Sequence, residues 1–339
     1  MLVGVLMKAM VLTKMRPVNF RPLTLEDIET PQPAPGQIRV KVNVCGVCHT
    51  DLHTVEGELG QVPLPIVPGH QVVGVVDAVN GKIRGIRVGD RVGVAWLHHV
   101  CGACPLCRRG DENLCRDARF TGYDVRGGYA EFMTVDPAFT YKLPSGASDE
   151  HVAPLLCAGI IGYRALRLSG VQPGGRVGLY GFGASAHIAI QIATYWKCRV
   201  YAFSRSESHR ALAARLGAVW TGESHEFPPD TLDAGVVFAP VGPIVPQAMG
   251  HLDRGGTLAL AGIYMTQIPP LDYEKHLYYE RGLRSVTAAT RRDGQELLKL
   301  AAKIPIRTAV RTYPLEQANE ALLDLKEGRI NGAAVLTLG

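Results

Sequence analysis

Residues 176–186 read Arg-Val-Gly-Leu-Tyr-Gly-Phe-Gly-Ala-Ser-Ala, and this stretch decides the fold of the second half of the chain. A short apolar run, typical of a buried strand, leads into a glycine loop, and residues 184–196 then follow a helical period. A second apolar run at 199–203 completes a strand–helix–strand unit. The loop follows the pattern G-x-G-x-x-G/A, with its members at Gly181, Phe182, Gly183, Ala184, Ser185 and Ala186. Main-chain N–H groups at such a helix start suit a pyrophosphate, so the stretch predicts a dinucleotide-binding loop.

The pattern on either side of this unit predicts two domains. Beyond it, strand-like and helical runs keep alternating, which is typical of a doubly wound parallel sheet. Before it, residues 8–150 hold short Val/Ile-rich runs separated by Gly, Pro and Asp, which indicates a mostly β domain. A helical run at 315–328 is followed by a last strand, which we expect to return to the first domain. We therefore predict an α/β protein of 339 residues, with a mostly β domain at 1–155, a parallel-sheet domain at 156–290 and a return at 291–339.

The composition excludes several classes of protein. Charged residues make up 20% and hydrophobic residues 47% of the chain, which is the balance of an ordinary globular protein. The formal net charge is only +5 and no long Lys/Arg run occurs, so we expect neither nucleic acid nor a membrane as partner. The opening MLVGVLM is too short for the apolar core of a signal peptide. We read Met7 as the start of the first strand, with residues 1–6 as an extension, and we expect a cytoplasmic protein.

Four of the eight cysteines follow the spacing C-x2-C-x2-C-x7-C: Cys101, Cys104, Cys107 and Cys115. Two-residue spacing in a long chain favours metal binding in a reducing compartment over disulfide bonds. Four thiolates so close in sequence suit tetrahedral Zn²⁺ and leave no coordination position for a substrate, so we predict a structural zinc. A nucleic-acid zinc ribbon is the alternative, but such ribbons usually pair two C-x2-C knuckles over a longer gap.

A second set of candidate ligands is dispersed along the chain and consists of Cys48, His70 and Cys157. Two sulfurs and one imidazole leave the fourth position of a tetrahedral zinc to a substrate oxygen, which is how catalytic zinc is held. One closed zinc site, one open zinc site and a dinucleotide loop in the same chain predict a zinc-dependent dehydrogenase that binds two Zn²⁺.

The stretch Cys45-Gly-Val-Cys-His-Thr-Asp-Leu-His53 and the triplet Pro68-Gly-His70 resemble the zinc-dependent medium-chain alcohol dehydrogenase family, and the likeness covers essentially the whole chain. The resemblance implies a GroES-like catalytic domain joined to a Rossmann coenzyme domain. It implies that the four-cysteine segment is the family's structural-zinc lobe. It also implies the ligands of the catalytic zinc, with Cys45 as a bystander: Cys48, His70 and, within Leu-Leu-Cys-Ala-Gly, Cys157.

The resemblance further implies roles for residues around the open site. Thr50 takes the proton of the alcohol and passes it through the nicotinamide ribose to His53, while Asp51 orients His70. Read without the family, Thr50 also fits a turn hydroxyl and His53 a surface histidine. Trp96 is a candidate wall of the substrate pocket and equally fits a core aromatic. Further cofactor contacts are implied for His49, Gly262 and Ile263.

Gln71 departs from the family, which usually has glutamate after the ligand histidine. The carboxylate of that glutamate is thought to approach the zinc during ligand exchange, and an uncharged amide cannot replace it fully. Gln71 leaves the primary ligands in place, but it makes a non-catalytic dinucleotide-binding sensor an alternative. A zinc-free quinone or enoyl reductase is a second alternative, against which the intact set of zinc ligands argues.

The residues after the second strand of the coenzyme unit bear on the choice of cofactor. An NAD enzyme carries Asp or Glu there to bind the ribose hydroxyls of adenosine, whereas this chain has Ser204 and Arg205. A carboxylate repels a 2′-phosphate, and serine with arginine can bind one, although Arg205 also fits a solvated loop. We therefore expect hydride transfer between an alcohol or aldehyde and NADP(H), in preference to NAD(H). Since the family forms dimers and tetramers, we expect a homodimer or homotetramer.

Overall fold

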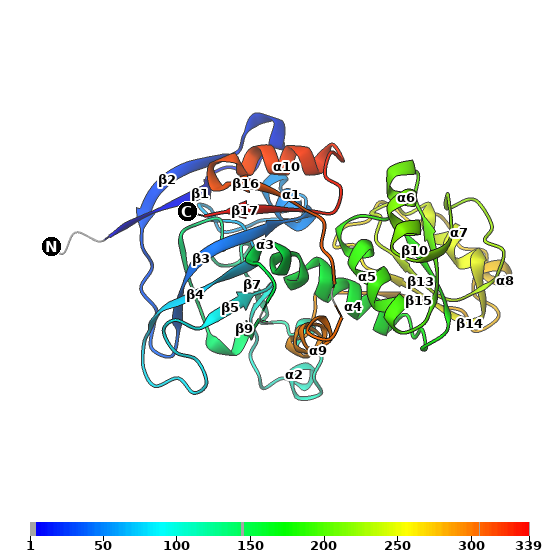
Figure 1. Ribbon diagram of the computed structural model, residues 1–339, viewed down its shortest axis with the longest axis horizontal. Helices are drawn as coiled ribbons and strands as arrows, with labels where there is room; N and C mark the ends of the chain where they lie inside the picture. The colour runs from blue at the N-terminus through cyan, green and yellow to red at the C-terminus, as the bar shows by residue number, and fades with distance from the viewer. Residues whose placement is uncertain (1–4, 144–145, 305, 339) are drawn as a thin grey trace. The chain divides into compact units, whose positions relative to one another are not determined.

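The computed structural model describes residues 5–143, 146–304 and 306–338, and contacts divide the chain into two compact units (Figure 1). Unit 1 consists of Met1–Cys157, Thr290–Lys303 and Thr308–Gly339, and unit 2 of Ala158–Ala289 and Ile304–Arg307. Within the described ranges, every helix is too short or too polar to cross a bilayer. The first strand begins at Leu6, one residue before the predicted start, and residues 1–4 of the expected extension lie outside the described residues.

Unit 1 is built on a seven-stranded, mostly antiparallel sheet with the order β16-β17-β3-β4-β5-β9, in which β8 also pairs with β3. The sheet consists of β3 (Ile38–Val47), β4 (Gln71–Val79), β5 (Arg91–Val94), β8 (Phe132–Val135), β9 (Thr140–Lys142), β16 (Val310–Pro314) and β17 (Ala333–Thr337). In β3 every second residue from Ile38 to Val44 is buried, as expected for a strand with one face on a core. Figure 1 shows the red C-terminal strand β17 beside the blue strand β3, with which it pairs antiparallel.

The other elements of unit 1 are short and surround this sheet. Two two-stranded sheets are formed by β1 (Leu6–Leu12) with β2 (Leu23–Glu29), and by β6 (Leu97–His99) with β7 (Arg119–Phe120). The helices are α1 (His49–Glu56), α2 (Pro105–Arg108), α3 (Asp149–Val152), α9 (Arg291–Ala301) and α10 (Ala318–Lys326). The 3-10 turns are η1 (Val18–Phe20), η2 (Glu112–Leu114), η3 (Pro137–Phe139), η4 (Ala153–Leu156) and η5 (Leu315–Gln317). The predicted helix at 315–328 therefore divides into η5 and α10.

Unit 2 is a six-stranded sheet with the order β12-β11-β10-β13-β14-β15, and all of its strand pairs are parallel. The strands are β10 (Arg176–Tyr180), β11 (Arg199–Phe203), β12 (Ala218–Gly222), β13 (Leu232–Val237), β14 (Leu252–Leu260) and β15 (Gly282–Ser285). The helices are α4 (Ala158–Leu168), α5 (Ala184–Tyr195), α6 (Glu207–Arg215), α7 (Ile244–His251) and α8 (Tyr273–His276). The strand order reverses between β10 and β13, which is the doubly wound Rossmann arrangement, so the predicted fold class is confirmed.

Candidate metal centres and cofactor loop

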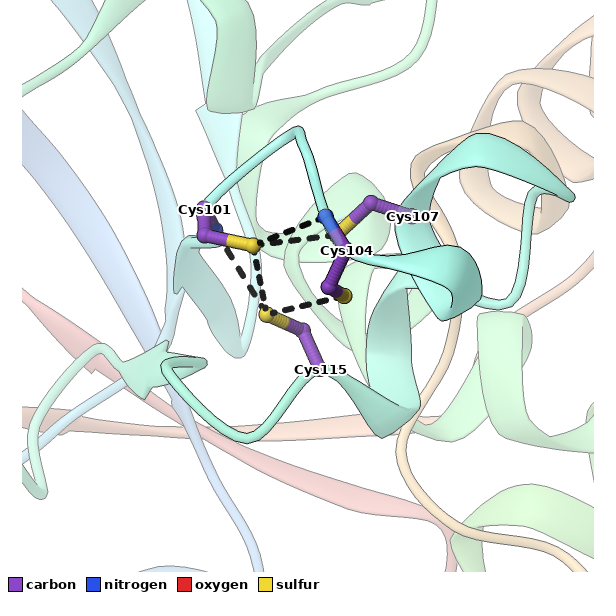
Figure 2. A group of neighbouring side chains, drawn as sticks. All are labelled: Cys101, Cys104, Cys107 and Cys115. Carbon is purple, nitrogen blue, oxygen red and sulfur yellow. Dashed lines mark hydrogen bonds between the residues drawn. The ribbon is translucent and has the colours of Figure 1, made fainter.

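Four cysteine side chains point toward one another in unit 1 (Figure 2). Cys101 follows β6, Cys104 is the N-cap of α2, Cys107 lies within α2, and Cys115 is the C-cap of η2. The sulfurs of Cys115 and Cys101 are 3.5 Å apart, those of Cys104 and Cys115 3.9 Å, and those of Cys101 and Cys107 4.0 Å. The N–H of Cys104 donates to the sulfur of Cys101 at 3.3 Å, so the turn itself fixes the direction of that side chain.

This four-cysteine cluster fits a tetrahedral zinc ion. With Zn–S bonds of about 2.3 Å, two ligands of a tetrahedral site lie about 3.8 Å apart, in the middle of the 3.5–4.0 Å range found here. Without a cation, Cys104 and Cys107 lose their protons at different pH values. The N–H of Cys107 lowers the pKa of Cys104 to about 7. Loss of solvation and the hydrogen bond with the Cys104 sulfur raise the pKa of Cys107 to about 12. A bound cation favours the thiolate form of all four ligands.

The three dispersed candidates also meet in unit 1, where their ligand atoms all lie within 4.8 Å of one another. Cys48 is the N-cap of α1, His70 directly precedes β4, and Cys157 follows η4. The sulfur of Cys48 lies 3.4 Å from Nε2 of His70. Gly69 has a φ of +97°, and a Cβ there would lie 2.3 Å from the Tyr129 ring, so only glycine lets this loop carry His70 into the site. Two sulfurs and one nitrogen match a zinc that takes its fourth ligand from a substrate.

Asp51 holds two members of this open donor set in place. Its Oδ2 accepts the N–H of Cys48 at 2.9 Å, and its Oδ1 lies 3.0 Å from Nδ1 of His70. Because an ionised carboxylate only accepts, the imidazole carries its proton on Nδ1 and leaves Nε2 for a metal. The sequence indicates the contact with His70; the contact with Cys48 arises because Asp51 also closes the capping box of α1.

The electrostatics of the open set also fit a cation. Burial lowers the pKa of His70, but Asp51 and Cys48 outweigh it and raise the pKa to about 10. The hydrogen bond with Cys157, together with burial, raises the pKa of Cys48 well above its usual value. A metal ion in contact with both residues opposes both shifts, since it favours the thiolate and the neutral imidazole.

Trp96 lies beside the open donor set. Its ring meets the ring of His70 edge-on at 5.0 Å and stacks on Phe120 at 5.0 Å with an interplanar angle of 17°. Tyr123 lies 5.9 Å from Trp96, and its hydroxyl donates to the carbonyl of Leu59 at 2.7 Å. The sequence does not single out Phe120 or Tyr123, because isolated aromatics carry no pattern that separates a pocket wall from a core.

Helix α1 carries the residues implied in proton transfer. The N–H of Thr50 donates to the sulfur of Cys48 at 3.4 Å, so Thr50 is the direct neighbour of a candidate ligand. One turn further along, His53 is buried and its Nδ1 hydrogen bonds with the carboxylate of Glu58. His49 is exposed, and its ring lies 6.1 Å from that of His53. The sequence does not indicate Glu58 as a partner of His53, because the contact depends on the left-handed turn at Gly57 rather than on helical spacing.

Gln71 is buried in the sheet and packs against Gly46, its partner in the pairing of β3 with β4. A Cβ at residue 46 would lie 2.9 Å from the amide carbon of Gln71, so the absence of a side chain there makes room for the amide. An amide can be buried here without the cost of desolvating a charge, which a glutamate would incur.

The glycine loop of unit 2 lies at the carboxyl end of β10. Gly181 has a φ of +85° and donates its N–H to the carbonyl of Phe203 at 2.8 Å, and a Cβ there would lie 2.9 Å from Ala239. Gly183 is the N-cap of α5 with open space at its Cβ position, so a ligand can approach its main chain. The remaining loop members are the buried Phe182 and Ala186 and the half-buried Ala184 and Ser185. Gly262 and Ile263 follow β14, another strand whose carboxyl end lies at this edge of the parallel sheet.

The loop after β11 carries Ser204 and Arg205 at the same edge of the sheet. Arg205 is exposed, whereas the guanidinium of Arg210 on α6 donates to the carbonyls of Ser204 at 2.6 Å and Arg205 at 3.1 Å. Ser206 caps α6 by accepting the N–H of His209. The loop is therefore braced by its own helix and presents an arginine to solvent.

Comparisons with known proteins place the chain in a family. The alcohol dehydrogenase GroES-like domain profile matches residues 34–145, and the zinc-binding dehydrogenase profile matches residues 184–303. The chain is 50% identical to a probable alcohol dehydrogenase AdhA of Mycobacterium tuberculosis (strain CDC 1551 / Oshkosh) over 95% of this chain and 94% of that protein. It is 37% identical to an alcohol dehydrogenase of Geobacillus stearothermophilus over 98% and 99% of the two chains.

A solved structure of a cinnamyl alcohol dehydrogenase from Sorghum bicolor matches with a TM-score of 0.89 and 25% identity, covering 98% of this chain and 97% of that one. Identity at this level extends over both units, so the likeness is not confined to a shared cofactor domain. The chain belongs to the zinc-dependent medium-chain alcohol dehydrogenase family.

Proposed function

We propose that the protein is a zinc-dependent alcohol dehydrogenase that also reduces aldehydes and prefers NADP(H) to NAD(H). The open donor set carries this proposal, because Cys48, His70 and Cys157 converge with Asp51 behind them and Thr50 next to them. Bound zinc supplies a Lewis acid that makes the proton of an alcohol easier to remove. The names of the relatives at 50% and 37% identity, both alcohol dehydrogenases, support the same substrate class.

The residues of unit 1 have distinct roles in this proposal. Cys48, His70 and Cys157 hold the catalytic zinc, and the four-cysteine cluster holds the structural zinc. Asp51 keeps Nε2 of the histidine directed at the metal. Thr50 takes the proton of the substrate hydroxyl, and His53 delivers it to solvent in oxidation and supplies it in reduction. Trp96, stacked on Phe120, bounds the substrate on one side.

The two functions are divided along the chain. We assign zinc binding and proton transfer to the catalytic domain of residues 1–155 with 291–339, and cofactor binding to residues 156–290. In the cofactor domain, Gly181–Ala186 receive the pyrophosphate, and Gly262 and Ile263 contribute main-chain contacts at the same sheet edge. His49 adds a contact from α1.

The loop after β11 supports the preference for NADP(H). Residues 204–206 carry no carboxylate, and the guanidinium of Arg210 lies under the main chain of that loop. Glu223 lies 3.8 Å from Arg210 and offsets part of its charge, which leaves Arg205 as the cation for a 2′-phosphate. The hydroxyl of Ser204 adds a neutral donor.

We also propose that the enzyme is a homodimer or homotetramer that works in the reducing cytoplasm. Strand β15 is an edge of its sheet in the described chain, and Tyr273, Tyr278 and Tyr279 nearby have exposed fractions of 66%, 58% and 39%. Edge strands and exposed aromatic side chains are typical of protein interfaces. Four closely spaced thiols bind zinc only in their reduced form, which favours a reducing compartment. Analytical ultracentrifugation tests the oligomeric state.

One experiment separates the proposal from its rivals. Zinc-loaded protein is assayed with primary, secondary and aromatic alcohols and their aldehydes, each with both cofactors, and again after removal of zinc. Alcohol oxidation that disappears with zinc supports the proposal. Cofactor binding without turnover of any substrate would indicate a dinucleotide sensor, the alternative that the replacement of the usual glutamate by Gln71 suggests. Turnover of quinones or enoyl compounds without zinc would indicate a zinc-free reductase.

A further inference from the structure

Helix α1 ends in a turn that brings Glu58 back against His53. Gly57 has a φ of +80° and donates its N–H to the carbonyls of His53 and Thr54. The N–H of Glu58 then donates to the carbonyl of His53 at 2.9 Å. Glycine adopts this left-handed conformation without the cost that a Cβ would add, which makes it the usual residue at such a helix end. As a result, a carboxylate that follows the helix reaches a side chain one turn inside it.

The two partners differ in their exposure. The side chain of His53 has an exposed fraction of 10%, and that of Glu58 has 43%. The imidazole is therefore held within the protein, while its carboxylate partner reaches solvent. Because an ionised carboxylate only accepts, the hydrogen bond places the ring proton on Nδ1 of His53. Nε2 then keeps its lone pair and is the nitrogen that can accept a proton.

We propose that Glu58 is a positioning residue for the proton pathway, fixing His53 in the tautomer that accepts at Nε2 and stabilising the imidazolium that forms. This inference rests on the proposed function. Oxidation of one alcohol gives one carbonyl compound, one hydride on the cofactor and one proton, and that proton leaves through His53 to water. In aldehyde reduction the imidazolium supplies the proton, and the same carboxylate holds the ring in position.

A purely structural explanation competes with this inference, because an acid–histidine pair at a helix end also stabilises the turn. The two explanations differ in what they change. If Glu58 only stabilises the end of α1, its loss changes the stability of that helix. If Glu58 positions His53, its loss changes the rate of the proton-coupled step and leaves the affinity for the substrate unchanged.

The kinetic test compares Glu58→Ala, Glu58→Gln and the control Glu316→Gln, which removes one exposed carboxylate elsewhere in unit 1. We expect Glu58→Ala to lower the single-turnover rate of alcohol oxidation about threefold to tenfold, the size expected for a partly exposed charged hydrogen bond. The KM for the alcohol stays within about twofold, and imidazole buffer restores part of the rate. Glu58→Gln keeps an acceptor for the Nδ1 proton but loses the charge, so its rate lies between the rates of the wild type and Glu58→Ala. Glu316→Gln behaves as wild type.

A second measurement does not depend on turnover. Nitrogen-15 NMR of histidine-labelled protein, with His53→Gln to assign the signal, reports which ring nitrogen carries the proton. We expect it on Nδ1 in the wild type and mainly on Nε2 in Glu58→Ala. A wild-type proton on Nε2, or an unchanged tautomer in the variant, overturns the proposal.

The outcomes separate this inference from the proposed function. If His53→Gln slows alcohol oxidation and Glu58→Ala does not, Glu58 only stabilises the end of α1, and the proposed dehydrogenase function is unaffected. If the zinc-loaded wild type oxidises no alcohol, the proposed function fails. The tautomer measurement then decides alone whether Glu58 fixes the ring of His53.

Discussion

Glu112 accepts hydrogen bonds from both the main chain and the side chain of Arg291, 179 residues further along the chain. The main-chain N–H of Arg291 lies 2.8 Å from Oε1 of Glu112, Nε lies 3.0 Å from both carboxylate oxygens, and Nη2 lies 2.5 Å from Oε2. Glu112 lies within the four-cysteine segment, and Arg291 is the first residue of α9. The pair therefore ties the cysteine cluster to the start of a helix that packs against η4, directly before Cys157.

We expect Glu112→Gln to lower the free energy of unfolding by about 2 kcal/mol, the usual worth of a hydrogen-bonded charge that is mostly buried. The amide keeps the shape but cannot accept both donors of the guanidinium as a charged pair. The measurement is urea unfolding of zinc-loaded protein, with zinc content determined in parallel. Glu316→Gln is the exposed control and changes stability by less than about 0.5 kcal/mol. Equal stability of the two variants would show that the pair contributes nothing measurable.

A second prediction concerns pH and the buried His251, whose Nδ1 lies 2.9 Å from the hydroxyl of Tyr180. Burial lowers the pKa of His251 from 6.5 to about 4. The folded state therefore binds fewer protons than the unfolded state between these values. The contribution of the neutral His251 to the free energy of unfolding is therefore fully present above about pH 6.5 and is lost as the pH falls toward 4. Between pH 7.5 and 5 this group alone lowers the free energy of unfolding by about 2 kcal/mol.

The variant His251→Asn tests this prediction, because asparagine keeps an acceptor for Tyr180 and does not titrate. Urea unfolding is followed at several pH values from 7.5 to 5 in both proteins. We expect the difference in unfolding free energy between wild type and variant to shrink by about 2 kcal/mol over that range. Parallel curves for the two proteins would mean that His251 is already protonated in the fold or accessible to water.

The parts of this protein that the sequence predicts are those in which local pattern and chemistry coincide. The glycine loop lies between a buried strand and a helix, and the four-cysteine set and the set of two cysteines and one histidine have ligand chemistry that few other functions use. Both could be identified without coordinates. Glu112–Arg291 could not, because nothing in either neighbourhood indicates a partner 179 residues away. Glu58 could not either, since its contact depends on the left-handed turn at Gly57 rather than on helical spacing. Helix α9 begins with a capping box at Thr290 and Asp293, which is a local sequence signal for a helix start.

The third prediction is that freshly purified protein contains two zinc ions per chain with different effects. Cys101→Ser should reduce the content to about one and lower the thermal stability, because structural zinc contributes folding free energy. Cys157→Ser should also reduce the content but mainly abolish turnover. Cys198→Ser, at a buried cysteine of unit 2 outside both ligand sets, is the matched control and should retain both ions. Elemental analysis, thermal unfolding and the alcohol assay provide the readouts. Full activity in zinc-free protein would refute the mechanism.

The fourth prediction concerns Thr50, which lies next to the candidate ligand Cys48. Thr50→Ala should lower the rate of hydride transfer by roughly 10²-fold or more, since it removes a positioned hydroxyl from the proton path. Thr50→Ser retains the hydroxyl and should retain most of the rate. His53→Gln should have a smaller effect that added buffer partly reverses, because water-borne bases can replace a terminal group. The comparison uses single-turnover kinetics at saturating alcohol. A wild-type rate in Thr50→Ala would exclude this path.

The fifth prediction is a preference for NADP(H) that depends on Arg205. A 2′-phosphate carries close to two negative charges, and a hydrogen bond to a charged group contributes roughly 1.5–3 kcal/mol. Arg205→Ala should therefore raise KM for NADPH about tenfold to a hundredfold and leave KM for NADH nearly unchanged. Ser204→Asp should invert the preference, since the carboxylate accepts from the ribose hydroxyls and repels the phosphate. The measurement is kcat/KM for both cofactors with one substrate.

Two further comparisons make this last prediction specific to the loop after β11. Arg215→Ala removes an exposed cation from the other end of α6, so it should leave the cofactor preference unchanged. The NADPH advantage of the wild type should shrink as ionic strength rises, because Arg205 is exposed and its contact with a phosphate is screened by salt. Arg210, whose guanidinium is engaged by the carbonyls of Ser204 and Arg205, should affect both cofactors when replaced, since its loss frees the whole loop. Wild-type kcat/KM that is equal or higher with NADH would return Arg205 to the role of a solvated loop residue.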